Sequence, residues 1–161
     1  SARMTHFISE AVGCSNEDVQ AMVLGGHGDT MVPLPRYTTV NGIPVTKLLD
    51  NEKIKSICER TASGGGEIVK LLERGSAFYA PGSAAAIMAE SILDDRKRVL
   101  PCSTYLNGEY GMNDIYIGVP VVLGKDGVER IIELDLEDDE LESLQGSGAF
   151  YKEQLSSILG Y

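Results

Sequence analysis

The sequence has no tryptophan, only two histidines and only three cysteines in its 161 residues. Cys14, Cys58 and Cys102 lie far apart, and none of them has the spacing of a zinc-binding or redox cysteine pair. Their odd number gives no basis for a disulfide framework. We therefore expect no metal site, reduced thiols and a cytoplasmic protein.

Positive charge is also scarce. Fourteen Lys and Arg residues face 24 Asp and Glu residues, which gives a formal net charge of -10. Nucleic-acid binding needs a basic surface, and an anionic membrane repels an acidic protein, so we expect neither partner. No apolar run approaches the roughly 20 residues that span a bilayer, and no signal-peptide pattern opens the chain.

A further absence concerns nucleotide binding. No Gly-x-Gly-x-x-Gly sequence follows a strand, and neither Gly64-Gly65-Gly66 nor Gly146-Ser147-Gly148 has the required spacing or a preceding strand. We therefore expect no cofactor-binding residue in this chain.

The residues that are present suit one domain over 1–161 with a substantial core. Apolar spacing and turn signals predict an α+β fold, in which an antiparallel sheet packs with long helices. The expected helices cover residues 2–12, 84–98 and the region after 135, and residues 46–73 are expected to form a short helical turn followed by a long helix. The expected strands cover residues 19–24, 99–106, 115–123 and 128–134, with a hairpin at 31–45 around Asn41-Gly42.

Two of these helices have unusual composition. Helical spacing runs through Gly64-Gly65-Gly66, which predicts a weak or kinked helix with another backbone close to Gly65; a loop between two helices is the alternative. Small residues on every side of 84–98 predict a buried helix, with Ser83 as N-cap and Arg96-Lys97-Arg98 as its last turn. Gly118 and Pro120 indicate a bulge or an edge in a later strand.

The most distinctive stretch surrounds His27. An apolar run leads into a loop with glycine at 25, 26 and 28, which lets the backbone turn sharply and approach a ligand. A histidine presented in this way can act as a general acid or base near neutral pH. A glycine-rich turn with a passive histidine fits the local pattern equally well. Arg3, on the polar face of the first helix, reads locally as a solvated side chain.

Longer stretches closely resemble the lactate/malate dehydrogenase family, and within it the bacterial malate dehydrogenases of the lactate-dehydrogenase-like type. The resemblance covers essentially the whole chain. It rests on Ser1-Ala2-Arg3, Leu24-Gly25-Gly26-His27-Gly28-Asp29-Thr30-Met31-Val32-Pro33, Arg60-Thr61-Ala62-Ser63-Gly64-Gly65, Tyr79-Ala80-Pro81, Arg98-Val99-Leu100-Pro101-Cys102 and Tyr105-Leu106-Asn107-Gly108-Glu109-Tyr110-Gly111.

The resemblance implies the carboxyl-terminal catalytic domain of such an enzyme, with NAD bound mainly by an amino-terminal Rossmann domain that this chain lacks. It implies that His27 is the catalytic acid/base and that Arg3 binds the substrate carboxylate. Malate and oxaloacetate are the implied substrates, in a reaction of the tricarboxylic acid cycle. Gly26, where many lactate enzymes carry a glutamate, favours malate over the alternative, lactate. A homo-oligomer, dimer or tetramer, is also implied.

Several family features are absent from the chain. It opens at Ser1 without an initiator methionine, as a piece of a longer protein does, and the aspartate that orients the family's histidine is missing. The substrate-specificity loop is missing too. We therefore expect the chain alone to be inactive; a non-catalytic oligomerisation domain is the alternative. Ser76, Ala77 and Ser83 lie near a segment that lines the family's substrate pocket, and their contact with substrate is left open.

Overall fold

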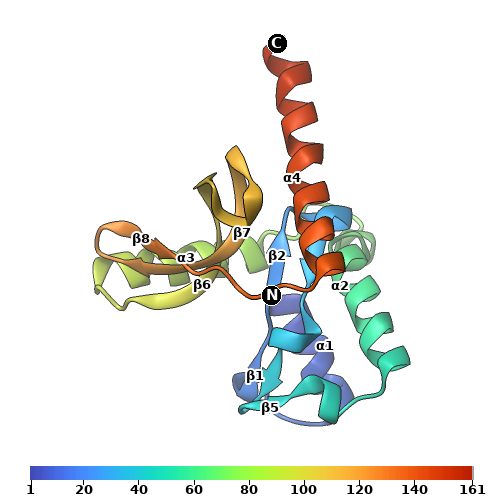
Figure 1. The fold of residues 1–161 in the computed structure, drawn as a ribbon. Helices are drawn as coiled ribbons and strands as arrows, with labels where there is room; N and C mark the ends of the chain where they lie inside the picture. Colours follow the sequence, from blue (N-terminus) through green and yellow to red (C-terminus); the bar gives the residue numbers. More distant parts are fainter. Residues whose placement is uncertain (161) are drawn as a thin grey trace. The chain divides into compact units, whose positions relative to one another are not determined.

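The structure is a computed structural model that describes residues 1–160. The part of the chain it describes contains helices and antiparallel strands, which confirms the α+β prediction (Figure 1). The helices are α1 (Ala2–Val12), α2 (Asn51–Leu72), α3 (Tyr79–Leu93) and α4 (Asp138–Leu159). The strands are β1 (Val19–Gln20), β2 (Val23–Gly25), β3 (Met31–Pro33), β4 (Thr39–Val40), β5 (Ile43–Pro44), β6 (Arg98–Asn107), β7 (Asn113–Gly124) and β8 (Gly127–Ile131).

The contacts divide the chain into two compact units. Unit 1 comprises Ser1–Val23 and Pro33–Ala77, and unit 2 comprises Leu24–Val32 and Phe78–Tyr161. Each unit is described by itself below. In the described residues, no helix is long and apolar enough to cross a membrane.

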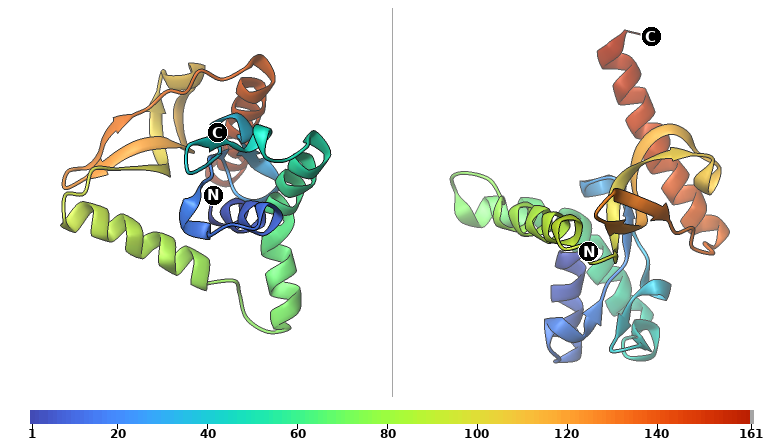
Figure 2. Two further views of the ribbon diagram at one scale, coloured as in Figure 1. Left: turned by 90° about the horizontal axis from the view of Figure 1, so that it is seen from below. Right: turned by 90° about the vertical axis from the view of Figure 1, so that its left-hand side faces the viewer.

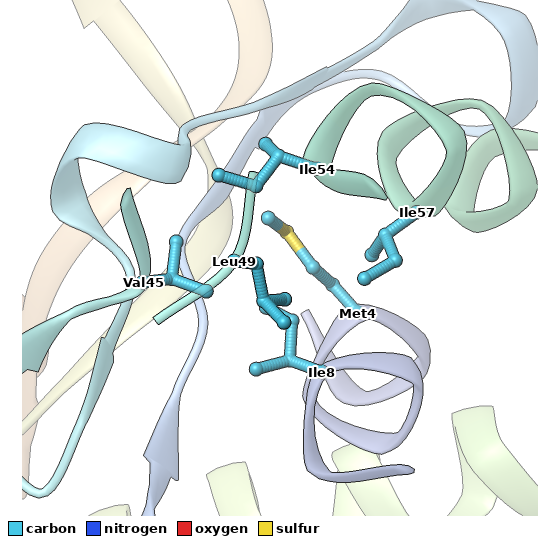
Figure 3. Close-up of a pocket in the computed structure, with 6 residues that line it drawn as sticks. All are labelled: Met4, Ile8, Val45, Leu49, Ile54 and Ile57. Atoms are coloured by element: carbon cyan, nitrogen blue, oxygen red, sulfur yellow. The ribbon is translucent and has the colours of Figure 1, made fainter. Parts of the chain in front are cut away.

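Unit 1 is built from α1, α2 and a small sheet in the order β1-β4-β5. The predicted Asn41-Gly42 turn is confirmed: φ is positive at both residues (47° and 83°), and Val40 pairs with Ile43 across it. Apolar side chains from α1, α2 and the segment before α2 converge around a gap with no room for a water molecule (Figure 3). These side chains are Met4, Ile8, Val45, Leu49, Ile54 and Ile57.

Helix α2 runs without interruption through Gly64-Gly65-Gly66, so the alternative of a loop between two helices is wrong. Its start is fixed by Asp50, whose carboxylate accepts a hydrogen bond from the Lys53 N–H at 2.7 Å. The expected approach of another backbone at Gly65 is also wrong, because the nearest group to that glycine is the side chain of Arg3.

Unit 2 contains a sheet in the order β3-β2-β7-β6, with β8 paired to β7. The successive antiparallel pairing of β6, β7 and β8 confirms the predicted meander. Strand β7 also pairs with β2, where Gly25 lies opposite Gly118. A Cβ on Gly118 would lie 2.5 Å from the Gly25 carbonyl oxygen, so this glycine marks a close crossing of two strands. The register irregularities lie elsewhere, at 106/107 and 122/123.

The single strand expected over residues 19–24 is wrong. Its first part, β1, pairs with β4, whereas β2 belongs to the sheet of β7. The two parts are separated at Met22, whose N–H donates a hydrogen bond to the Thr38 hydroxyl at 3.2 Å. The chain therefore leaves one sheet and enters another just before the loop that carries His27.

Helix α3 differs most from its prediction. It begins at Tyr79, because Pro81 is accommodated in the first turn where its missing N–H has no cost. Ser83 thus lies inside the helix instead of capping it, and Arg98 already belongs to β6. The expected burial is wrong as well, since Ser91 is the helix's one buried residue. Its hydroxyl donates to the Leu123 carbonyl oxygen of β7 at 2.6 Å. Figure 2 shows α3 beside the sheet that contains β7.

Helix α4 begins where the acidic run predicts. Glu137 and Glu140 form a reciprocal capping box, and the acidic first turn suits the positive end of the helix dipole. The helix buries Leu144, Ser147 and Gly148 within unit 2. This buried face is the one that reaches the His27 loop.

Candidate active site

His27 lies in a loop that we call the histidine loop, residues 25–30, between β2 and β3. The loop leaves the strand at Gly25 with φ +79° and continues through His27 in an extended conformation (φ -115°). Gly28, with φ +71°, then opens a short 3₁₀ turn, η2 (Gly28–Thr30). Positive φ is strained for residues with a side chain, which gives a direct conformational reason for glycine at positions 25 and 28. The His27 side chain is exposed.

The backbone of the histidine loop is held by two hydroxyl groups of α4. The His27 N–H donates to the Tyr151 hydroxyl at 3.0 Å, and the Gly26 N–H donates to the Ser147 hydroxyl at 2.9 Å. Ser147 in turn donates to the Thr30 carbonyl oxygen at 2.8 Å. The loop also closes on itself, since the Gly26 N–H lies 3.2 Å from that same Thr30 oxygen. These bonds fix the main chain on both sides of the imidazole.

The hydrogen bonds at Tyr151 also change its acidity. The Thr30 hydroxyl lies 3.4 Å from the Tyr151 oxygen, and the His27 N–H points at the same atom. The hydrogen bond from the Thr30 hydroxyl, and to a smaller extent that from the His27 N–H, lowers the pKa of the Tyr151 hydroxyl below its usual value. Both hydrogen bonds favour the phenolate. Tyr151 is thus an acceptor at the loop.

Arg3 is held in a different manner, through its side chain. It lies in the first turn of α1 and is half-buried against α2. Its Nη1 donates to the Thr61 carbonyl oxygen at 3.3 Å. A Cβ on Gly65 would lie 2.8 Å from the Arg3 Nη2, and one on Gly64 would lie 3.1 Å from its Cδ. The glycines of α2 therefore leave the space that this arginine occupies.

A second arginine of unit 1, Arg60, is committed to other partners. Its guanidinium pairs with Glu67 through Nε at 3.2 Å and Nη2 at 2.9 Å, lies 3.6 Å from Glu10, and stacks 4.1 Å from the Phe7 ring centroid. It borders an open hollow of about 440 Å³ between α1 and α2. Its ion pairs already satisfy its charge, so we assign it no substrate.

The sequence-derived site residues fall in both units. Arg3, Ser76 and Ala77 belong to unit 1, and His27 and Ser83 belong to unit 2. Ser76 and Ser83 are exposed and Ala77 is half-buried. Their contact with a substrate stays untested, and the assignments of His27 and Arg3 stay predictions.

Sequence reasoning missed Ser147 and Tyr151. Both lie more than a hundred residues from the loop they hold. One signal was present: the two hydroxyls stand four residues apart, on the same helix face as the apolar Leu144. A polar group within an apolar stripe points to a buried hydrogen-bond partner.

The described residues offer no metal-binding group, since no three His, Cys, Asp or Glu side chains gather among residues 1–160. The described residues also contain no glycine-rich phosphate loop between a strand and a helix, the element that binds the phosphates of a dinucleotide.

Comparisons with known proteins identify the family of this chain. Residues 1–159 match the family described as lactate/malate dehydrogenase, alpha/beta C-terminal domain. A malate dehydrogenase of Roseiflexus sp. is 54% identical over 98% of this chain, which covers 51% of the relative. The chain thus spans about half the length of the curated relatives it matches.

Solved structures show the same relationship. A malate dehydrogenase from Salinibacter ruber superposes with a TM-score of 0.96 at 54% identity, covering 99% of this chain and 52% of the other. A lactate dehydrogenase from Eimeria maxima, solved with NADH and oxamate, gives 0.95 at 47% identity over 99% of this chain and 51% of the other.

Proposed function

This chain belongs to the lactate/malate dehydrogenase family, and we propose that it is the catalytic and substrate-binding half of an NAD-dependent malate dehydrogenase. The enzyme interconverts (S)-malate and oxaloacetate. In this proposal residues 1–161 form one carboxyl-terminal domain. The observation that carries it is the exposed His27, whose backbone is fixed on both sides in the loop that follows β2.

His27 is the acid/base of the proposed reaction. In the reducing direction its protonated imidazole donates a proton to the keto oxygen of oxaloacetate, which becomes the hydroxyl of malate. In the oxidising direction the neutral imidazole accepts that hydroxyl proton. A fixed main chain with an exposed side chain suits this role, because it presents the ring to a substrate at a defined point.

Arg3 binds a carboxylate of the substrate. A guanidinium offers a planar set of five N–H donors, and a carboxylate can accept two of them in parallel. The hydrogen bond to Thr61 uses one donor and fixes the orientation of the group. The two roles are thus divided: Arg3 binds and orients the substrate, and His27 transfers the proton.

NAD, when bound, supplies the hydride exchange, and we assign no residue of this chain to it. The absence of a phosphate-binding glycine loop supports its assignment to the other half of the enzyme. A cytoplasmic location stays a prediction from composition alone.

We propose further that the enzyme is a homo-oligomer, a dimer or tetramer. Several large apolar side chains of α2 and α3 are exposed in this chain, including Leu71 (77%), Tyr79 (79%) and Leu93 (83%). Exposed apolar groups of this size are typical of surfaces that another chain or domain covers. Size-exclusion chromatography with light scattering tests this; a clean monomer of the complete enzyme contradicts it.

The lactate dehydrogenase half is the second candidate, because the Eimeria enzyme superposes almost as well as the Salinibacter malate dehydrogenase. The complete enzyme separates the two, because the substrate-specificity loop lies outside this chain: NADH oxidation is followed with oxaloacetate and with pyruvate. A chimeric enzyme, which joins this chain to the amino-terminal half of the Roseiflexus relative, tests the catalytic roles of this chain's own residues.

We expect the complete enzyme to have a higher kcat/KM with oxaloacetate than with pyruvate. The chimeric enzyme is expected to oxidise NADH with oxaloacetate, and the 161-residue chain alone is expected to have no activity. A preference of the complete enzyme for pyruvate contradicts the malate assignment. Turnover by the isolated chain contradicts the division of the enzyme into two halves. A chimera that is folded but inactive with either substrate contradicts the dehydrogenase function.

A further inference from the structure

The two hydroxyls that reach the histidine loop act on neighbouring peptide groups. Tyr151 accepts from the N–H of His27, and Ser147 accepts from the N–H of Gly26. They stand at positions i and i+4 of α4 and therefore share one face of that helix. We call Ser147 and Tyr151 the hydroxyl pair. All four residues belong to unit 2, so the arrangement depends on no contact outside it.

The space around Gly26 is shaped by the same pair. A Cβ on Gly26 would overlap the Tyr151 ring at Cε2 and lie 2.6 Å from its hydroxyl. A Cβ on Gly25 would lie 3.1 Å from the Ser147 hydroxyl and 2.7 Å from the Thr30 carbonyl oxygen. Two glycines of the loop are thus needed for α4 to approach its backbone.

The hydroxyl pair contacts main-chain groups of the loop and leaves the imidazole exposed. Ser147 is 5% exposed and forms two hydrogen bonds to the loop, one as acceptor and one as donor. A buried hydroxyl with both functions used restrains the groups it bonds. The position of the His27 backbone therefore depends on α4.

We propose that Ser147 and Tyr151 are positioning residues for the acid/base step: they hold the main chain of Gly26 and His27 so that the imidazole meets the substrate in one orientation. This inference rests on the proposed function of His27. It predicts that removal of a single hydroxyl lowers the rate of catalysis while substrate affinity is kept, because both hydroxyls bond main-chain groups of the loop.

Hydrogen exchange of backbone amides in the 161-residue chain tests the geometry without any assay of activity. Tyr151→Phe removes the acceptor of the His27 N–H. Ser147→Ala removes the nearer of the two acceptors of the Gly26 N–H and leaves the Thr30 carbonyl oxygen at 3.2 Å. Tyr116→Phe is the matched control, since Tyr116 is a 67% exposed tyrosine on β7 of the same unit.

Loss of one hydrogen bond is expected to speed exchange at His27 in Tyr151→Phe, and at Gly26 in Ser147→Ala, by about 2- to 10-fold. The control is expected to leave both rates unchanged. Equal rates at His27 in Tyr151→Phe and Tyr116→Phe overturn the proposal.

Kinetics of the chimeric enzyme test the consequence. Tyr151→Phe is expected to lower kcat with oxaloacetate about tenfold or more, because small displacements of a catalytic group are costly. KM is expected to change less than about threefold. A general loosening of the unit predicts instead that kcat, KM and the urea midpoint all change together, and that result overturns a positioning role.

One further variant separates this proposal from the function on which it rests. If His27→Asn abolishes turnover while Tyr151→Phe behaves as the control, only the positioning role is overturned. If His27→Asn retains full turnover, the acid/base assignment fails and the positioning role fails with it.

Discussion

His27 and Arg3 are held in opposite ways. The histidine loop is fixed through its main chain, by hydroxyls of α4, and the imidazole stays exposed. Arg3 is fixed through its side chain, which lies half-buried in the space left by glycines of α2. A group that transfers a proton needs a defined origin and a free ring, whereas a group that binds a carboxylate needs a defined plane. The difference in support thus matches the difference in the proposed roles.

The largest expected effect comes from His27→Asn in the chimeric enzyme. General acid/base catalysis contributes about 10²- to 10⁴-fold, so kcat with oxaloacetate is expected to fall by that factor. The bonds that hold the loop at this residue use its main chain and persist in the variant. Urea unfolding of the 161-residue chain is therefore expected to be unchanged; a large loss of stability instead shows that the imidazole has a structural role.

Arg3→Lys tests the other side of the comparison. A lysine keeps the charge and loses the planar pair of donors. A hydrogen bond to a charged group contributes roughly 1.5–3 kcal/mol, so KM for oxaloacetate is expected to rise about 10- to 100-fold with a smaller change in kcat. Arg60→Lys, in the same unit and paired with Glu67, is the matched control and leaves KM unchanged. A fall in kcat at constant KM contradicts the binding role.

The glycines of α2 offer a finer test of how Arg3 is held. Gly66→Ala meets no atom within 4 Å, so it is expected to raise the free energy of unfolding by up to about 1 kcal/mol through helix propensity and leave KM unchanged. Gly65→Ala places a methyl group 2.8 Å from the Arg3 Nη2. We expect a smaller gain in stability and a several-fold rise in KM. Identical kinetics for the two variants would show that Arg3 does not need this space.

The smallest effect concerns the pH dependence of the loop's support. Because the pKa of Tyr151 is lower in the folded protein, ionisation of its hydroxyl to the phenolate stabilises the folded state. Its stabilising contribution is complete above the unfolded-state pKa near 10 and is lost as the pH falls through the lower folded-state value. The stability difference between the wild type and Tyr151→Phe is therefore expected to grow from neutral to alkaline pH in urea unfolding. A difference that shrinks with rising pH contradicts the hydrogen bonding described here.

The sequence predicts local features of both regions well. Turn-forming Asn41-Gly42, the acidic start of α4 and the glycines around His27 act through their own backbone or their nearest neighbours, so their effect can be read from a short window. Continuous helical spacing through Gly64-Gly65-Gly66 likewise predicts the course of α2.

Features that depend on distant residues could not be read in this way. The partners of the histidine loop, Ser147 and Tyr151, follow more than a hundred residues later, and nothing local pairs them with it. Helix α3 has the composition of a buried helix, yet most of its surface is exposed in this chain. The helix begins at Tyr79, before the expected residue 84, because a proline such as Pro81 fits a first turn.

The central claim is that Arg3 binds the substrate carboxylate and that His27 is the acid/base of the proposed reaction. The most direct measurement is a crystal structure of the chimeric enzyme with NADH and oxamate, the ligands of the Eimeria structure. The account predicts that the oxamate carboxylate accepts two hydrogen bonds from the Arg3 guanidinium, and that the His27 imidazole lies within hydrogen-bond distance of the oxamate carbonyl oxygen. A bound oxamate that contacts only one of the two side chains, or neither, would contradict it.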